Sequence, residues 1–343
     1  MSSSVPFLLA CRRQPVPYTP IWLMRQAGRY MAEYRAIRER LSFLELCKTP
    51  SAAAEVTLQP VEHMGVDAAI LFADILLVLE PLGLGLSFAK GDGPAIAHPV
   101  RDAAHVARMP RVDVADGLAY VFETVRLVKQ ELRGRVPLIG FAGAPFTLAS
   151  YAIEGAGSRN YAHTKRLMYG QPDAFDALMA RLVEVTADYL NGQIDAGVEA
   201  VQVFDSWVGN LAPEDYRARV LPHMQELFRR IGGRVPVINF STGTSGFLEL
   251  VSAAGGDVVG LDWRISLADG WQRVGHDRAV QGNLDPGILL GPRNVIRERA
   301  RALLKEAGGR PGHVFNLGHG ILPETPPDNV RALVETVHEL SAR

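Results

Sequence analysis

The sequence predicts an α/β fold, in which parallel strands alternate with helices around one sheet. Three observations predict this class. Short apolar runs recur along the chain, segments with helical periodicity separate most of them, and each run stops at a polar or glycine-rich corner. Strands that are apolar throughout are typical of parallel sheets covered by helices. Eight such units favour a closed, single-domain (β/α)8 barrel, a TIM barrel, over the competing open, doubly wound sheet.

The expected strands are apolar runs of strand length, each bounded by glycine, proline or polar residues. In chain order they cover residues 20–24, 67–73, 136–142, 199–205, 235–240, 257–263, 278–283 and 313–318. In a barrel, each strand is followed by a helix that packs on the outside of the sheet.

Three of the intervening helices carry clear boundary signals. Thr-Pro at residues 49–50 is typical of a helix N-cap followed by proline in the first turn. Apolar residues spaced by three and four from 175 to 190 predict a helix that ends at Gly197. A similar apolar stripe from 330 to 340, after a Pro-Pro pair, predicts a closing C-terminal helix.

The domain organisation follows from length and from the lack of linkers. The chain has 343 residues, which one core can sustain. No low-complexity segment, charge block or long linker marks a boundary. We therefore expect one barrel domain over residues 1–343, with residues 1–17 as an extended N-terminal segment.

The composition excludes several function classes. The formal net charge of -1 argues against a protein that binds nucleic acid backbones. Two cysteines cannot form a disulfide framework and fit a reducing cytosol. The N-terminal stretch has no signal-peptide pattern, and Asp74 and Glu80 interrupt the apolar stretch 68–86, which disfavours a membrane span. We expect a cytoplasmic protein with no nucleic acid and no membrane as partner.

The first expected strand is followed by two arginines. In a barrel, chemistry lies where the C-terminal ends of the strands meet their loops. Arg25 and Arg29 stand at such an end, and guanidinium groups bind carboxylates bidentately, so they predict an acidic ligand. Gly28 would let the backbone turn closely around it. Arg35 and Arg38 come next, but arginine is abundant in this chain, so a solvated helix face explains this pair equally well.

Asp74 lies in the most apolar stretch of the chain, after the second expected strand. A buried carboxylate must be paired or hydrogen-bonded, because unpaired burial is costly. One interpretation is an ion pair with a barrel arginine. The other is a functional one, in which Asp74 accepts ligand N–H donors or balances a cation formed during a reaction.

Tyr151, Ser206 and His319 are weaker candidates at three other strand ends. A loop tyrosine is often packed, and a serine after a strand often caps a helix. His319 lies between two glycines, where a site role and a capping role fit equally well. The remaining strand ends carry Asp205, Ser241, Asp262, Asn283 and Asp285.

Several kinds of chemistry lack their motif in this sequence. There is no GxxxxGK[ST], no GxGxxG after the first strand, no HExxH, no GxSxG, and no cysteine pair with zinc-site spacing. Cationic arginines, one buried carboxylate and a few hydroxyl or imidazole groups remain. That set suits an acid–base or decarboxylation reaction on a polyanionic molecule.

Two long motifs and several short ones occur together in a fixed order. They are WLMRQAGRYMAEYR (22–35), VTLQP (56–60), ILFADIL (70–76), GFAGAPFTLASYAIEG (140–155), FDSW (204–207), VVGLDW (258–263), QGNLDP (281–286) and NLGHGI (316–321). The first resembles the signature W-x-M-R-Q-A-G-R-x-x-P-E-[FY] of the uroporphyrinogen decarboxylase family, and the others match that family in order. The resemblance covers the chain from about residue 18 onward.

The resemblance implies a single (β/α)8 barrel, a homodimer with facing clefts, and conversion of uroporphyrinogen III to coproporphyrinogen III without metal or organic cofactor. In the matching positions it implies that Arg25 and Arg29 bind substrate carboxylates and that Asp74 accepts pyrrole N–H groups; these three are the expected catalytic residues. The other implied pocket residues are Arg38, Tyr151, Ser206 and His319, with Gln26, Ala27 and Gly28 through the backbone.

The implied chemistry agrees with the residues. A pyrrole protonated on a ring carbon is an electron sink for decarboxylation, and Asp74 is placed to balance the resulting cation. An arginine or an ordered water would supply protons, although the high pKa of arginine makes it a poor general acid. Three departures from the family pattern leave this chemistry intact: Ala32 for proline, Trp207 where some members carry histidine, and Asp205 where others carry glutamate.

Two rival functions remain. Barrel methyltransferases of the same superfamily use a zinc site with a His-x-Cys element, but neither Cys11 nor Cys47 has a histidine two residues before it. A tetrapyrrole-binding protein without activity could keep the arginines, but it would have no reason to keep Asp74 buried beneath them.

Overall fold

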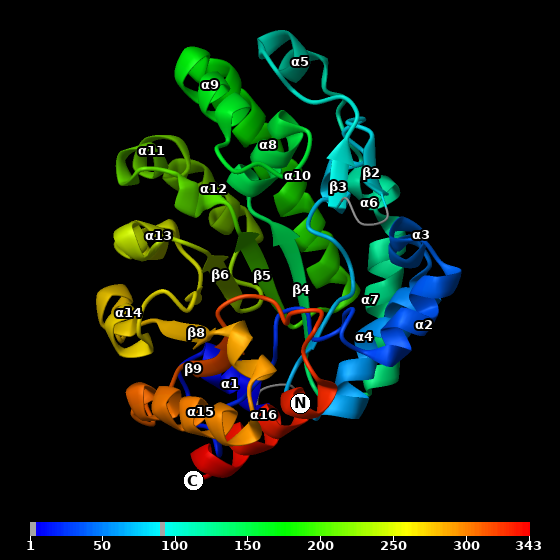
Figure 1. Cartoon of the computed structure of the whole chain (residues 1–343). Coiled ribbons are helices and arrows are strands. Elements are labelled where there is room, and N and C mark those ends of the chain that lie inside the picture. The colour runs from blue at the N-terminus through cyan, green and yellow to red at the C-terminus, as the bar shows by residue number, and fades with distance from the viewer. Residues whose placement is uncertain (1–4, 90–92) are drawn as a thin grey trace.

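A curled sheet of seven parallel strands forms the centre of the molecule (Figure 1). The computed structural model describes residues 5–89 and 93–343. The strands, in their order across the sheet, are β1 (Ala69–Ile70), β4 (Leu138–Gly143), β5 (Ala200–Asp205), β6 (Val237–Ser241), β7 (Val258–Gly260), β8 (Ala279–Leu284) and β9 (His313–Leu317). Each lies within a run predicted as a strand or extends one residue beyond it. All six residues of β4 and of β8 are buried, as the parallel arrangement requires.

The first expected strand, residues 20–24, is reduced to one bridge between Ile21 and Phe315 of β9. On its other side, the carbonyl of Ile21 accepts the N–H of Asp67 at 2.8 Å. Residues 20–22 therefore lie between β9 and the start of β1, where the eighth strand of a closed barrel would lie. The ladder of main-chain hydrogen bonds stops there because the next N–H donates to a side chain instead: the N–H of Met24 donates to Oδ1 of Asn316 at 3.1 Å.

Asp67 holds this junction together. Its buried carboxylate accepts the N–H of Ile21 at 2.7 Å and the hydroxyl of Tyr18 at 3.0 Å. On Oδ2 it also meets Nε2 of His338, from the last helix, at 2.7 Å. One side chain thus links three segments that are far apart in the sequence.

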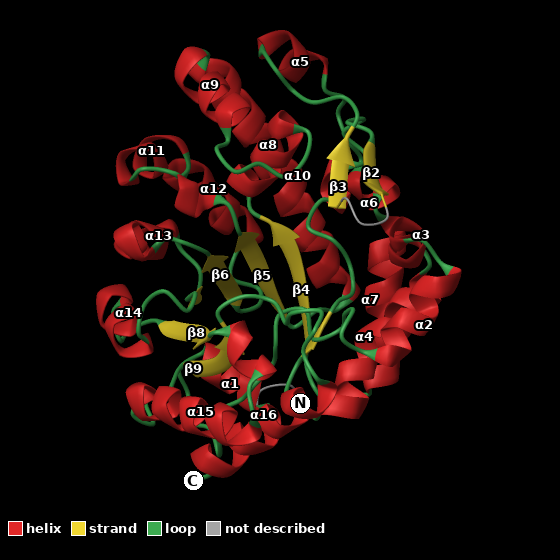
Figure 2. Ribbon diagram, viewed as in Figure 1, coloured by secondary structure: helices red, strands yellow, loops and turns green. Residues whose placement is uncertain are grey.

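Helices surround the sheet on its outside (Figure 2). They are α1 (Pro6–Cys11), α2 (Ala32–Arg40), α3 (Phe43–Lys48), α4 (Pro50–Met64), α5 (Ala103–Arg108), α6 (Val114–Gly117), α7 (Ala119–Leu132), α8 (Pro145–Glu154), α9 (Ala162–Gly170), α10 (Pro172–Ala196), α11 (Pro213–Arg219), α12 (Leu221–Ile231), α13 (Leu248–Ala254), α14 (Leu267–Val274), α15 (Arg293–Ala307) and α16 (Pro327–Ser341). Short 3-10 helices are η1 (Leu77–Leu79), η2 (Val208–Asn210), η3 (Ser245–Phe247) and η4 (Pro286–Leu290).

The three predicted helix boundaries are confirmed. Helix α4 begins with Pro50 directly after Thr49, and α16 begins at Pro327 after Pro326. Helix α10 ends at Gly197, which takes the left-handed conformation with φ of 119° that a C-terminal glycine allows.

The prediction of an extended segment over residues 1–17 is wrong for residues 6–11, which form α1. Phe7 and Leu8 in this helix are buried and α1 packs against β8 and β9, so burial of its apolar residues favours the helix. Residues 1–4 lie outside the described part of the chain.

The apolar stretch 68–86 contains β1, η1 and the start of an antiparallel hairpin, β2 (Leu86–Ala89) and β3 (Gly93–Ile96), which the sequence did not predict. In the described part of the chain, no helix has the length and apolar character needed to cross a membrane.

Candidate functional site

The loop that carries Arg25 is anchored to the chain just before β1 by Gln26. Oε1 of Gln26 accepts the N–H of Leu23 at 3.0 Å, and Nε2 donates to the carbonyl of Ala68 at 3.0 Å. Its main-chain N–H donates to the carbonyl of Leu23 at 2.9 Å, and its carbonyl accepts the hydroxyl of Tyr30 at 2.7 Å. Gln26 is therefore a buried anchor whose main-chain polar groups are already bonded within the loop, and the backbone contact that the resemblance implies stays a prediction.

Arg25 sits in a strained backbone conformation, with φ of 61°. The left-handed region costs roughly 1 kcal/mol for a non-glycine residue and is often found at functional sites. The side chain is exposed, and its charge acts on Asp74 and His319, where it lowers the pKa of each. Arg25, Asp74 and His319 thus come together at the C-terminal end of the sheet.

The residues after Arg25 form a tight turn. A Cβ on Gly28 would lie 3.1 Å from the carbonyl oxygen of Arg25, so the glycine allows a close approach within the loop, and its backbone contact with a ligand stays a prediction. Nη1 of Arg35 donates to the carbonyl of Arg29 at 2.9 Å, which gives Arg35 a structural role. The side chain of Arg29 is exposed, and Ala27 is partly exposed. Both remain predicted ligand contacts.

Arg38 is engaged within the protein. Its guanidinium donates to the carbonyl of Leu41 and lies over the ring of Phe43, with 5.8 Å between Cζ and the ring centre. These contacts fix the turn between α2 and α3. Arg38 stays a predicted substrate residue, but its contacts favour a structural role.

Asp74 follows β1 and remains partly exposed. Burial raises its pKa to about 6, while the N–H of Leu76, which donates to Oδ1 at 2.8 Å, and the charge of Arg25 oppose that rise. Among the described residues, no arginine forms an ion pair with Asp74 within 4.0 Å. The interpretation of Asp74 as one half of a structural ion pair is therefore wrong. Its carboxylate has capacity left for an N–H donor or a cation.

Tyr151, on α8, forms an aromatic wall with Trp207. The rings are stacked with centres 3.7 Å apart, and Tyr161 packs edge-on against Trp207 with centres 5.1 Å apart. Burial raises the pKa of Tyr151 to about 12, and the charge of Asp74 adds to the rise. Tyr151 is therefore a neutral hydroxyl near Asp74. Trp207 was not predicted as part of the wall, because its role depends on packing.

Ser206 precedes this wall and is held by its main chain, whose carbonyl accepts the hydroxyl of Thr242 at 2.6 Å. Asp205 is buried, and its Oδ1 accepts the hydroxyl of Thr147 at 2.7 Å. Burial raises the pKa of Asp205 to about 7, against the hydrogen bonds from Thr147. The same Thr147 oxygen accepts the N–H of Trp207 at 3.2 Å. Asp205 thus fixes the aromatic wall through Thr147.

His319 lies between loops that approach closely because both of its neighbours are glycines. A Cβ on Gly318 would lie 2.4 Å from the nitrogen of Trp263, and one on Gly320 would lie 2.4 Å from Cδ of Arg25. Burial lowers the pKa of His319 to about 4, and the charges of Arg25 and Arg264 add to this, against Asp262. His319 is therefore neutral near pH 7. It can offer one N–H donor and one nitrogen acceptor.

Arg264 is a further cation beside His319 that the sequence reasoning missed. Its Cζ lies 4.2 Å over the Trp263 ring, which meets His319 edge-on at 6.4 Å between ring centres. Nη1 of Arg264 donates to buried Asp262 at 2.6 Å, while about half of the Arg264 side chain (49%) is exposed. The signal was available, since Arg264 follows an expected strand as Arg25 does.

Polar residues at the remaining strand ends serve the scaffold. Asp262 also accepts the N–H of Gly243 at 2.7 Å, and Asn283 donates to the carbonyl of Asp262 at 2.8 Å. Ser241 bonds Thr244 at 2.8 Å, and Asp285 accepts the N–H of Gly287 at 2.8 Å. Strand-end position alone therefore does not separate ligand-facing side chains from those that position loops.

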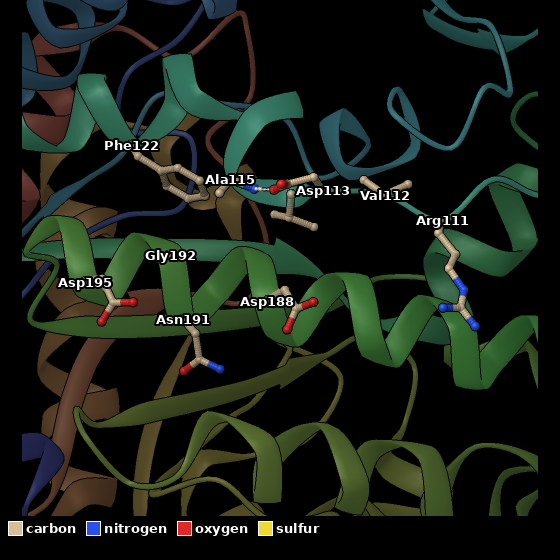
Figure 3. A pocket seen from close by; sticks show the side chains of 10 residues that line it. Arg111, Val112, Asp113, Ala115, Phe122, Asp188, Asn191, Gly192 and Asp195 are labelled. Carbon is tan, nitrogen blue, oxygen red and sulfur yellow. Dashed lines mark hydrogen bonds between the residues drawn. The ribbon is translucent and has the colours of Figure 1, made fainter.

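A surface cavity of about 560 Å³ lies elsewhere, between α10 and the segment containing α6 and α7 (Figure 3). Three of its polar residues are engaged within the protein: Asp113 caps α6, Asn191 donates to the carbonyl of Arg230, and Asp195 pairs with Arg234. A second cavity of about 390 Å³ borders Trp263 and Arg264. Neither cavity contains Asp74 or Arg25 in its lining.

Both cysteines are buried, and burial raises the pKa of each thiol well above its ordinary value. Each is therefore a protonated thiol packed in the core rather than a reactive thiolate. Within residues 5–89 and 93–343, no group of three or more His, Cys, Asp or Glu side chains is placed to hold a metal ion.

Comparison with solved structures supports the fold. A methyltransferase from Methanosarcina mazei superposes with a TM-score of 0.84 over 99% of both chains, at 19% sequence identity. A vitamin-B12-independent methionine synthase from Listeria monocytogenes, described as putative, gives a TM-score of 0.57 at 12% identity. At such low identities these likenesses concern the fold alone.

Comparison with known sequences is more specific. The model of the family "Uroporphyrinogen decarboxylase (URO-D)" matches residues 3–340. A uroporphyrinogen decarboxylase from Carboxydothermus hydrogenoformans is 58% identical over 98% of this chain and 96% of its own length. One from Chloroflexus aurantiacus is 59% identical over 96% of this chain and 94% of its own length. The chain therefore belongs to the uroporphyrinogen decarboxylase family.

Proposed function

We propose that this chain decarboxylates the four acetate side chains of uroporphyrinogen III to methyl groups, giving coproporphyrinogen III. Relatives that share more than half of its residues over nearly its whole length carry the name of this activity. The structural observation that carries the proposal is the placement of Arg25 beside Asp74. An exposed guanidinium suits the substrate carboxylates, and a desolvated carboxylate suits a cation that forms during the reaction.

In the proposed mechanism, a proton adds to a pyrrole ring carbon and makes the ring cationic. The bond between the acetate CH₂ and its carboxylate then breaks, carbon dioxide leaves, and the electron pair neutralises the ring as an exocyclic methylene. A second proton converts that methylene to a methyl, and the ring carbon loses the first proton. Each acetate thus consumes one proton and releases one carbon dioxide.

Asp74 acts at the cationic stages. Its carboxylate accepts the pyrrole N–H groups and stays close to the positive charge, which it stabilises most strongly in a site with little water. Tyr151 and His319 are neutral near pH 7 and orient the substrate through hydrogen bonds. His319 is not a standing acid, because burial and two arginines keep its pKa low, at about 4.

The proposed carboxylate-binding set is wider than one arginine. Arg25 and Arg29 lie on the loop after Trp22, and Arg264, which packs on the Trp263 ring, acts on His319 as Arg25 does. Ser206, Ala27 and Arg38 complete the proposed substrate contacts. A substrate with eight carboxylates can engage several such cations around its rim.

The activity should depend on pH through Asp74. The pKa of this carboxyl is raised to about 6, so its charge is present above pH 6 and is lost as the pH falls through 6. We expect kcat/KM, which reports the free enzyme, to fall tenfold per pH unit below about 6. Bound pyrrole N–H groups favour the ionised form, so the corresponding limb in kcat should lie at lower pH.

Initial rates from pH 4.5 to 8.5 measure both limbs. Asp205 is the control, because its pKa is also raised, to about 7. The acid limb of kcat/KM should remain near pH 6 in Asp205→Asn. A limb that disappears in that variant would assign the titration to Asp205 and contradict the role given to Asp74.

The reaction itself is tested by incubating the protein with uroporphyrinogen III without oxygen, then oxidising and separating the porphyrins. We expect hepta-, hexa-, penta- and tetracarboxylate products to appear in succession. Only the octacarboxylate should remain with heat-denatured protein. Binding of the substrate without any loss of carboxylate would instead support a non-catalytic tetrapyrrole-binding protein.

We also propose, on the family resemblance alone, that residues 1–343 act as one domain, that two copies associate as a homodimer, and that the protein works in the cytoplasm. Light scattering that returns the mass of one 37.4 kDa chain at working concentrations would exclude the dimer.

A further inference from the structure

We infer that Gly320 is a positioning residue, whose missing side chain determines where the Arg25 guanidinium lies. One part of the inference rests on the proposed function, namely that Arg25 binds a substrate carboxylate. The geometry of the two residues carries it independently of any ligand.

The side chain of Arg25 passes directly over Gly320. A Cβ built on Gly320 would lie 2.4 Å from Cδ, 2.7 Å from Cγ and 3.0 Å from Nε of Arg25. Carbon atoms that are not bonded to each other make favourable contact at about 3.5–4.0 Å, so an alanine here cannot coexist with this Arg25 rotamer. The contact involves the middle of the arginine side chain, so relief requires the guanidinium to move.

Neither backbone can readily step aside. The N–H of Ile321, next to Gly320, donates to the carbonyl of Met24, next to Arg25, at 2.9 Å. On the other side of Arg25, the buried side chain of Gln26 joins the loop to Ala68. The two chains are thus fastened together at the place where the clash would arise. The arginine side chain is the element that must give way.

Backbone conformation does not explain a glycine at this position. Among the described residues, seventeen glycines have positive φ, and Gly320 is not one of them. An alanine is therefore compatible with the backbone at 320, and the replacement tests space alone. Arg25 itself has the strained conformation, with φ of 61°, which aims its side chain across the glycine.

The position of this guanidinium matters for its neighbours. Arg25 acts electrostatically on Asp74 and on His319, the residue before Gly320. A displacement of about 1 Å in a positioned group can lower a rate by roughly a hundredfold. Gly320 therefore sets the relation between the carboxylate-binding cation and the carboxylate beneath it.

A double-mutant cycle tests the inference with Gly320→Ala, Arg25→Ala and the double variant. We expect Gly320→Ala to lower kcat/KM for uroporphyrinogen III by about ten- to a hundredfold. Arg25→Ala removes the colliding atoms, so adding Gly320→Ala to it should change nothing further. Anaerobic binding of coproporphyrinogen III, the unreactive product, should follow the same pattern. Additive losses, or wild-type kinetics in Gly320→Ala, would overturn the inference.

Thermal unfolding supplies a readout that needs no ligand. Gly320→Ala should lower Tm when Arg25 is present and leave it unchanged in the Arg25→Ala background. Gly246→Ala is the matched control, because no atom lies within 4 Å of its built Cβ and its φ is ordinary. Failure of the wild type to convert uroporphyrinogen would contradict the proposed activity alone. Equal losses of Tm from Gly320→Ala in the wild type and in the Arg25→Ala variant would overturn the role of Gly320.

Discussion

Asp74→Asn is expected to lower kcat for uroporphyrinogen III by about a thousandfold, which corresponds to roughly 4 kcal/mol of transition-state stabilisation. Asparagine keeps the size of the side chain and an oxygen for the N–H of Leu76, which Asp74 accepts at 2.8 Å. It lacks the negative charge that balances the cationic pyrrole. Asp74→Gly, which removes the acceptor as well, should abolish turnover. Anaerobic initial rates followed by porphyrin separation measure both variants.

Asp74→Asn should lower the activity but raise the free energy of unfolding. The pKa of Asp74 is raised to about 6 in the folded protein from its ordinary value of 3.8, so the fold favours the protonated form. Stability from this group is full below pH 3.8 and is lost as the pH rises through 6. Asp74→Asn should therefore raise the unfolding free energy by about 1–2 kcal/mol at pH 8, and by much less at pH 4.

Asp257→Asn is the matched control for the charge change. Asp257 is exposed, precedes β7, and accepts the N–H of Val237 at 2.8 Å, so it lies at the opposite end of the sheet from Asp74. Its kcat should match that of the wild type. Near-normal turnover in Asp74→Asn, or a loss of stability at pH 8, would refute the account of Asp74.

Arg25→Ala is expected to lower kcat/KM by about a hundred- to a thousandfold, because the variant loses both the carboxylate contact and the fixed charge beside Asp74. Arg25→Lys keeps one positive charge without the planar fork, so its loss should be about tenfold to a hundredfold. Steady-state kinetics with uroporphyrinogen III measure the series.

The control for Arg25 is Arg229→Ala, on the outer surface of α12, where Arg229 pairs with Glu226. It should retain wild-type kinetics. If Arg25→Lys were as active as the wild type, charge alone would suffice and bidentate binding by Arg25 would be contradicted.

Most of the sheet could be predicted from the sequence because buried parallel strands leave continuous apolar runs. The segment 20–24 fails for a physical reason. Its N–H groups at Leu23 and Met24 donate to the side chains of Gln26 and Asn316 instead of to a neighbouring strand, and Asn316 is so distant in the sequence that it leaves no local pattern. The hairpin of β2 and β3 was missed because Gly83 and Gly85 supply the exposed positions of the alternating stretch before β2, and glycine is typical of a loop rather than of a strand.

The site was only partly predictable. Position after a strand identified Arg25, Asp74 and His319, which the structure brings together. The same rule could not show that Arg38 is occupied by the turn before α3, or that Trp207 is half of an aromatic wall. Those roles depend on which side chains meet in three dimensions.

Asp67 makes the rigidity of the loop that carries Arg25 depend on contacts far from the site. Its carboxylate, at the start of the second expected strand, hydrogen-bonds the chain before Arg25 and also contacts α16. Loss of this carboxylate would therefore loosen segments that it does not contact. The segment that supports Arg25 is therefore held in place by Asp67 and by α16, although neither is expected to contact the substrate.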